Sequence, residues 1–116
     1  MDKTVNLSFD YMLKDRPVAH VEVLSDGTIR CERFTEDVMD NPLPFGNTPE
    51  GLEWFWKSRC FPPTRDGVDD LLKLLGLKYY SPLGIVRKTR GQQNDDFYWV
   101  RFEGDTVSYQ DIKLRD

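Results

Sequence analysis

The stretch that decides the fold runs from residue 51 to residue 102. It reads GLEWFWKSRCFPP (51–63), TRDGVDDLLKLLGL (64–77), SPLGIVRKTRG (81–91) and DDFYWVRF (95–102). All three tryptophans of the protein lie in it: Trp54, Trp56 and Trp99. Helix-start signals recur along this stretch and an aromatic run closes it, so it predicts three short helices followed by a strand.

Thr48-Pro49-Glu50 predicts the start of the first helix. Threonine is a good N-cap, proline fits the first helical position, and glutamate suits the positive end of the helix dipole. Helical spacing predicts three side chains facing the core: Leu52, Phe55 and Trp56. Trp54 and Lys57 then point elsewhere, and Phe61-Pro62-Pro63 ends the helix.

The second and third helices have their own start and stop signals. Asp66 is the predicted N-cap of the second helix and Gly76 its end. Its apolar stripe, predicted to be core, consists of Val68, Leu71, Leu72 and Leu75. Ser81-Pro82 predicts the start of the third helix, in which Leu83 and Val86 give one apolar face.

The residues before position 48 supply strands. Residues 4–11 alternate between apolar and polar side chains, which predicts a half-buried strand. Residues 13–17 turn the chain into a second strand at 18–24, and Ser25-Asp26-Gly27 signals a hairpin to a third strand at 28–34. Three of these strands in succession predict an antiparallel meander with one face open to water.

The remaining segments complete the predicted sheet. Residues 35–47 contain Pro42 and Pro44, which exclude a helix or a central strand around them and predict a crossing loop. Residues 97–102 form an aromatic strand, followed by a turn and a last short strand at 106–109. One domain over residues 1–116 is predicted, of the α+β class: an antiparallel sheet of about four to five strands with two to three short helices packed on one face.

The charge distribution argues against nucleic-acid binding. The net charge is −4, and the first 50 residues carry 5 basic and 10 acidic side chains against 11 and 10 in the rest. A nucleic-acid binder gathers Lys and Arg on one face, so no direct nucleic-acid contact is expected. The acidic half fits a solvated face or contact with a basic protein surface. Without a membrane-length apolar run or a signal-peptide pattern, a cytoplasmic protein without membrane contact is predicted.

Catalytic and metal-binding patterns are lacking in the sequence. No phosphate loop or dinucleotide fingerprint occurs, so no cofactor is predicted. The three possible zinc ligands, His20, Cys31 and Cys60, are scattered, so no metal site is predicted, and the two thiols are expected to be reduced. His20 is interpreted as a solvent-facing strand residue beside Glu22, with a catalytic base as the alternative. These observations predict a protein that is not an enzyme.

Three surfaces are candidates for binding a protein partner. Trp54 is an interface-type side chain, although a cover over the strand face explains it equally well. Leu43 and Phe45 lie in the long 35–47 loop, where they either contact a partner or pin the loop to the core. The third candidate is a cluster of cations, which also suits the negative end of the third helix: Arg87, Lys88 and Arg90.

The segment from Phe55 to Arg65 resembles the N-terminal region of HipA-like proteins, of the type found in Firmicutes and mobile elements. The shared pattern is aromatic-Trp, then Arg, Pro and Arg. Three further motifs agree in order: Asp15-Arg16-Pro17-Val18, Leu43-Pro44, and the segment from Gly91 to Trp99 that ends in Asp96-Phe97-Tyr98-Trp99. The resemblance spans residues 13–102.

The resemblance implies a particular function. In full-length HipA proteins this region precedes a Ser/Thr kinase core, and no kinase loop, catalytic Asp or magnesium motif occurs here. The expectation is a freestanding N-terminal subdomain that restrains a HipA-family kinase toxin as an antitoxin does. The alternative is a phage or mobile-element inhibitor of a nucleic-acid enzyme, similar to an anti-CRISPR protein. Arg59 and Arg65 are then interpreted as folding residues that bond carbonyls at the end of the first helix or pair with Asp95 and Asp96.

Overall fold

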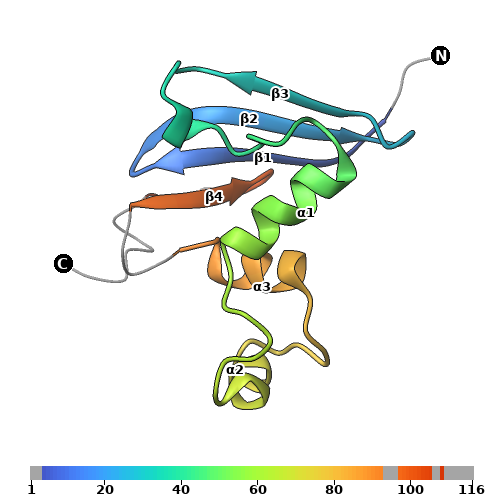
Figure 1. The fold of residues 1–116 in the computed structure, drawn as a ribbon, viewed down its shortest axis with the longest axis vertical. Coiled ribbons are helices and arrows are strands. Elements are labelled where there is room, and N and C mark those ends of the chain that lie inside the picture. Colours follow the sequence, from blue (N-terminus) through green and yellow to red (C-terminus); the bar gives the residue numbers. More distant parts are fainter. Residues whose placement is uncertain (1–3, 93–96, 106–107, 109–116) are drawn as a thin grey trace.

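The structure is a computed structural model that describes residues 4–92, 97–105 and 108. At its centre lies a four-stranded antiparallel sheet in the order β3-β2-β1-β4 (Figure 1). Its strands are β1 (Val5–Leu13), β2 (Arg16–Leu24), β3 (Ile29–Arg33) and β4 (Tyr98–Phe102). Between β3 and β4 lie a 3-10 turn and three helices: η1 (Val38–Asp40), α1 (Pro49–Ser58), α2 (Val68–Leu74) and α3 (Pro82–Thr89). The predicted α+β class is confirmed.

The hairpin between β1 and β2 is tighter than the sequence predicted. The prediction of a turn over residues 13–17 is wrong, because β1 continues to Leu13 and β2 already starts at Arg16. Only Lys14 and Asp15 lie between them, and Lys14 takes a positive φ of 54°. Since a two-residue hairpin needs positive φ, a lysine here fills a position that Gly or Asn usually holds, which hid the turn.

Helix α1 covers one face of the sheet with aromatic side chains. The ring of Phe9 on β1 stacks on Phe55 with centroids 5.6 Å apart and lies 4.9 Å from the ring of Trp56. Trp56 also stacks against Phe102 of β4 at 6.0 Å. The predicted core residues of α1 are confirmed, since Leu52, Phe55 and Trp56 are all buried.

The helix caps follow the sequence at two of the three helices. Thr48 Oγ1 accepts a hydrogen bond from Gly51 N at 3.0 Å, and Ser81 Oγ accepts one from Gly84 N at 3.2 Å. The prediction of Asp66 as the N-cap of the second helix is wrong. The N-cap of α2 is Gly67, in the left-handed region and without a side-chain cap bond.

Helix α2 stands apart from the sheet (Figure 1). Of its predicted core stripe only Leu72 is buried, while Val68, Leu71 and Leu75 are half-buried. Leu74 is 82% exposed. The helical spacing correctly identified the inner side of α2. The helix has only seven residues and stands apart from the sheet, so too few other residues pack against that side to bury it fully.

The end of α1 is fastened to β4 by Arg59. This residue is buried, and its Nε and Nη2 atoms donate to the carbonyls of Gly91 and Tyr98, each at 2.9 Å. Gly91 has φ 66°, and a Cβ there would lie 3.2 Å from Val100 Cγ2, so a glycine is needed just after α3, where the backbone passes against β4. Arg59 therefore joins helix to strand, as expected of a folding residue, but through the carbonyls of Gly91 and Tyr98 and not through those at the end of α1.

Two predicted features differ or fall outside the described part of the chain. The 35–47 loop is not without structure, because η1 forms in it with Asp37 as N-cap. The predicted strand at 106–109 and the predicted partners Asp95 and Asp96 lie outside the described residues. Within the described ranges, no helix is long and apolar enough to cross a membrane.

Candidate functional site

Two exposed aromatic side chains meet on the outer side of α1. Phe45 of the loop and Trp54 of the helix form an edge-to-face pair with ring centroids 4.8 Å apart. Phe45 is 68% exposed and Trp54 is 44% exposed. Burial of large aromatic groups is a main source of binding energy at protein interfaces. The loop and the helix, which were separate candidates in the sequence, therefore form a single aromatic surface.

The backbone holds this pair in place. The loop passes so close to the start of α1 that a Cβ on Gly51 would collide with the carbonyl oxygen of Gly46. Gly46 itself has φ 109°, a conformation that only glycine adopts without strain. A glycine at position 51 therefore lets the loop lie on the helix, and Phe45 reaches Trp54 as a result.

Acidic side chains border the aromatic pair. A shallow depression of about 460 Å³ beside Trp54 is lined by Pro49, Glu50, Glu53, Trp54 and Lys57. The two glutamates sit one helical turn apart and are exposed. Together they give the apolar surface a negative rim, which favours a partner with basic side chains around an apolar anchor.

Leu43 does not belong to this surface. Its side chain is only 4% exposed and is part of the hydrophobic core. Its role is to pin the loop, which is one of the two interpretations the sequence allowed. Of the two loop residues predicted to bind a partner, Leu43 and Phe45, only Phe45 is exposed.

The structure divides the predicted cationic cluster. Arg87 is exposed, and its guanidinium lies over the ring of Phe102, 4.8 Å from the centroid. Lys88 is exposed to solvent. Arg90 caps α3 in the left-handed region with φ 56°, and its carbonyl accepts from Val100 N at 2.7 Å. Its guanidinium lies 3.5 Å from the Asp105 carboxylate. Arg90 is therefore part of the connection to β4, and only Lys88 and part of Arg87 remain as surface cations.

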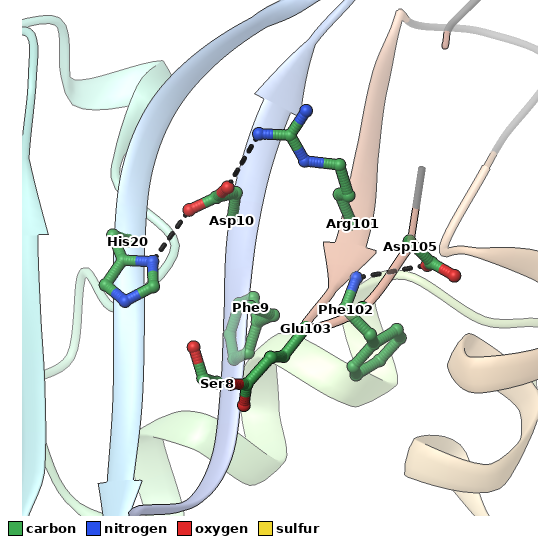
Figure 2. A pocket seen from close by; sticks show the side chains of 9 residues that line it. Ser8, Phe9, Asp10, His20, Arg101, Phe102, Glu103 and Asp105 are labelled. Carbon is green, nitrogen blue, oxygen red and sulfur yellow. Dashed lines mark hydrogen bonds and ion pairs between the residues drawn. The ribbon is translucent and has the colours of Figure 1, made fainter. Parts of the chain in front are cut away.

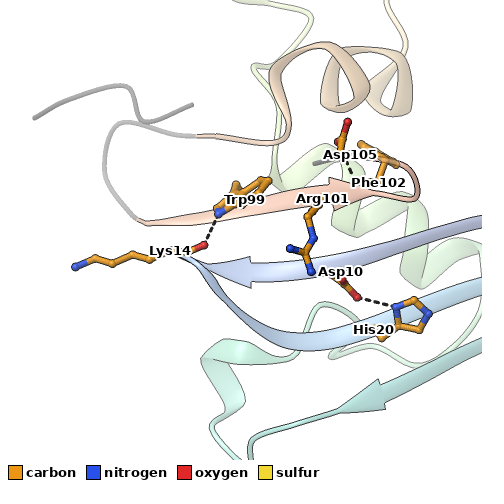
Figure 3. Close-up of polar contacts among 7 residues, drawn as sticks. All are labelled: Asp10, Lys14, His20, Trp99, Arg101, Phe102 and Asp105. Carbon is orange, nitrogen blue, oxygen red and sulfur yellow. Dashed lines mark hydrogen bonds and ion pairs between the residues drawn. The ribbon is translucent and has the colours of Figure 1, made fainter. Parts of the chain in front are cut away.

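A row of polar and charged side chains crosses the face of the sheet opposite α1. The strand registers align Glu32, His20, Asp10 and Arg101, one from each strand. Asp10 lies between its two neighbours, with Oδ1 2.7 Å from His20 Nδ1 and Oδ2 2.8 Å from Arg101 Nη2 (Figures 2 and 3). Glu22 approaches the other ring nitrogen of His20 only to 4.0 Å. The contact of His20 with Glu22, its neighbour in the sequence pattern, is thus secondary to its bond with Asp10.

This row borders a polar depression of about 390 Å³, which also contains Ser8, Glu103 and Asp105 (Figure 2). A histidine bonded to an aspartate through Nδ1 is the base half of a hydrolase triad, which would also need a nucleophile at Nε2. Ser8 lines the depression, but among the described residues no hydrogen bond joins it to His20. Both oxygens of Asp10 are occupied, one by His20 and one by Arg101, so the row ties β1, β2 and β4 together.

Two tyrosines fasten the connecting segments to the core. Burial and the hydrogen bond that Tyr98 donates to Asp40 Oδ1 raise the pKa of Tyr98 well above its ordinary value. Burial and contact with Cys60 raise the pKa of Tyr80 to about 12. Tyr80 also donates to the Phe61 carbonyl at 2.6 Å, where α1 leads into the Pro-Pro segment. Burial raises the pKa of the Cys60 thiol as well, which makes it a poor nucleophile.

Comparison of the chain with models of protein families, with curated proteins and with solved structures gives no match. The function is therefore argued from the surface itself and from the sequence motifs.

Sequence reasoning found Phe45 and Trp54 separately but missed that they touch. It also missed the bond between Asp10 and His20. The available signal was that both residues take outward positions in two adjacent strands. The two-residue turn at Lys14 and Asp15 alone would place Ala19 opposite Asp10, and the register shift between Tyr11 and Met12 brings His20 there instead.

Proposed function

We propose that the protein is a non-catalytic protein-binding module that acts through the aromatic surface of Phe45 and Trp54. The observation that supports this proposal is an exposed, edge-to-face aromatic pair held by a rigid helix start and bordered by two glutamates. Large patches of exposed aromatic surface are uncommon on proteins that act alone. An anchor whose rotamer is already fixed loses little entropy on binding.

The proposed partner is a HipA-family Ser/Thr kinase toxin, which the protein restrains as an antitoxin. The motifs around Phe55–Arg65 suggest this partner. Arg59 belongs to those motifs and is buried, so the motifs favour a shared fold, and the partner itself must be identified by experiment. The rival partner is a nucleic-acid enzyme that binds the acidic first half of the chain, as an anti-CRISPR target would.

The test is co-purification from the native host with a tagged copy, followed by an assay of the captured protein. Wild type should capture a protein that autophosphorylates with ATP, and adding more of the purified chain should reduce that phosphorylation. Trp54→Ala should weaken capture by roughly 30-fold, the effect of losing about 2 kcal/mol at an interface anchor. Phe45→Ala should have an effect in the same direction.

Tyr79→Ala is the matched control, because Tyr79 is an even more exposed aromatic residue at 74% and lies between α2 and α3, outside the aromatic surface. It should leave capture unchanged. Capture of a nuclease that is unaffected by Trp54→Ala and is lost at high salt would overturn the proposal. It would favour the rival, an enzyme bound through the acidic first half of the chain.

A further inference from the structure

The sheet has an open edge at β3. Among the residues that the structure describes, β3 pairs only with β2, with Val21 opposite Cys31 at the centre of the ladder. In Figure 1, β3 forms the border of the sheet on the side away from β4. An open edge offers backbone N–H and C=O groups to another strand.

The outward groups belong to the odd-numbered residues of β3. Leu24 N donates to Thr28 O at 2.8 Å and Phe34 N donates to Val18 O at 2.9 Å, so these pairs are hydrogen-bonded. Hydrogen-bonded and non-bonded pairs alternate along an antiparallel ladder. The backbone groups of Ile29, Cys31 and Arg33 therefore point away from β2 toward the open edge.

The side chains of β3 are self-complementary about Cys31. When a second copy of β3 lies antiparallel with Cys31 opposite its counterpart, Arg30 faces Glu32 of that copy and Glu32 faces its Arg30. Cys31 then pairs with its counterpart and Ile29 with Arg33 of the other copy. Each of these three pairs exchanges two backbone hydrogen bonds, about six in all. Arg30 and Glu32 fall in the non-bonded positions, where side chains approach most closely.

Charged edges prevent pairing when like charges meet, whereas this register brings opposite charges together. Arg30 already donates to Glu22 at 2.9 Å, which holds its guanidinium on the outer face of the sheet. Glu32 is exposed and forms no ion pair with any residue that the structure describes. Arg30 of a second copy would supply the missing partner.

We propose that the open edge of β3 binds the β3 edge of a second copy of this chain, forming a two-fold dimer with a continuous eight-stranded sheet. This surface is separate from Phe45 and Trp54, so the dimer and the proposed partner are independent of each other. An edge of five residues buries less than a standard interface, so the dimer is weak and visible only at high protein concentration.

Sedimentation velocity of the full chain from about 10 μM to about 1 mM tests this dimer. Wild type should shift reversibly from monomer to dimer. Arg30→Glu alone and Glu32→Arg alone place like charges opposite each other in both pairs, so each should weaken the dimer about tenfold or more. An equimolar mixture of the two variants restores both pairs in a heterodimer and should recover the wild-type affinity within about threefold.

Recovery in the mixture separates this pairing from the internal bond between Arg30 and Glu22, since a defect inside one copy is not repaired by another. Arg33→Glu, the same charge reversal at a position opposite Ile29 in the proposed register, should leave the dimer within about twofold of wild type. Circular dichroism checks that each variant is folded. Should a charge variant not fold, Arg33→Pro decides: it removes the outward N–H group of residue 33 and should abolish the dimer, whereas Arg33→Glu loses the same side-chain bond to Asp37 O and should not.

Three results would overturn the proposal. They are a wild-type chain that stays monomeric at about 1 mM, a dimer unaffected by the single variants, and a mixture that does not recover.

Discussion

Three consecutive aromatic residues of α1 have opposite environments. Phe55 and Trp56 are 2% and 3% exposed, whereas Trp54 is 44% exposed. Each residue turns by about 100° around a helix, so the sheet beneath α1 receives two of the three rings and the third faces outward. The buried pair packs on β1 and β4, while Trp54 contacts Phe45 on the solvent side. Nearly identical side chains on one helix thus separate into a folding role and a surface role.

The largest expected effect is on the buried side. Trp56→Ala removes the ring between Phe9 and Phe102 and should lower the free energy of unfolding by about 3–5 kcal/mol, because the core cannot close the cavity. Trp54→Ala should change it by less than about 1 kcal/mol. Urea unfolding followed by circular dichroism measures both. Equal losses for the two tryptophans would refute the division of roles.

A smaller loss is expected where α1 meets β4. Arg59→Met keeps the length of the side chain but leaves the carbonyls of Gly91 and Tyr98 without their donor, which should cost about 2–3 kcal/mol. Arg65→Met is the matched control, since Arg65 is exposed and lies over Phe61 at 5.9 Å, and it should change stability by less than about 0.5 kcal/mol. Similar urea midpoints for both variants would show that Arg59 does not join the helix to the strand.

The smallest effect concerns the anchor of the loop. Tyr98→Phe removes the hydrogen bond to Asp40 and should cost about 1–2 kcal/mol near neutral pH. The raised pKa of Tyr98 means that the folded state holds the phenol proton more tightly than the unfolded state. Its contribution is fully present below the ordinary tyrosine pKa of about 10 and is lost as the pH rises above it.

Urea unfolding at about pH 9 and about pH 11 measures this contribution. Wild type should lose more stability between the two values than Tyr98→Phe does. Tyr80, with its pKa raised to about 12, weakens wild type and variant alike in that range, so the difference between them isolates Tyr98. An equal loss of stability in wild type and Tyr98→Phe would contradict the contribution assigned to the Tyr98 hydroxyl.

Local signals in the sequence predicted most of the fold. Thr48 and Ser81 were recognisable as N-caps because each precedes a proline at the first helical position, and helical spacing separated Phe55 and Trp56 from Trp54. The errors arose where local rules leave alternatives open. Lys14 takes a positive φ that its residue type does not predict. Gly67, and not Asp66, is the N-cap of α2, because the left-handed backbone there suits glycine.

The candidate site was only half visible in the sequence. Exposure of Trp54 followed from its helix position, but contact with Phe45 depends on the close passage of the Gly46 backbone over Gly51. Burial of Leu43 and the bond from Arg90 to β4 depend in the same way on segments distant in sequence. No spacing rule reports such contacts, because they are set by how the loop crosses the domain.

The sequence by itself determined the type and order of the elements, since hydrophobic period, capping residues and turn residues act within a few positions of each other. Only the tertiary structure decided the register of the strands and the meeting of side chains across them. The row of Asp10, His20 and Arg101 depends on the register shift between Tyr11 and Met12 and on the pairing of β4 with β1, and the open edge of β3 follows from the strand order. A shift of one residue in that register would move every side chain to the opposite face, so these surfaces are properties of the assembled sheet.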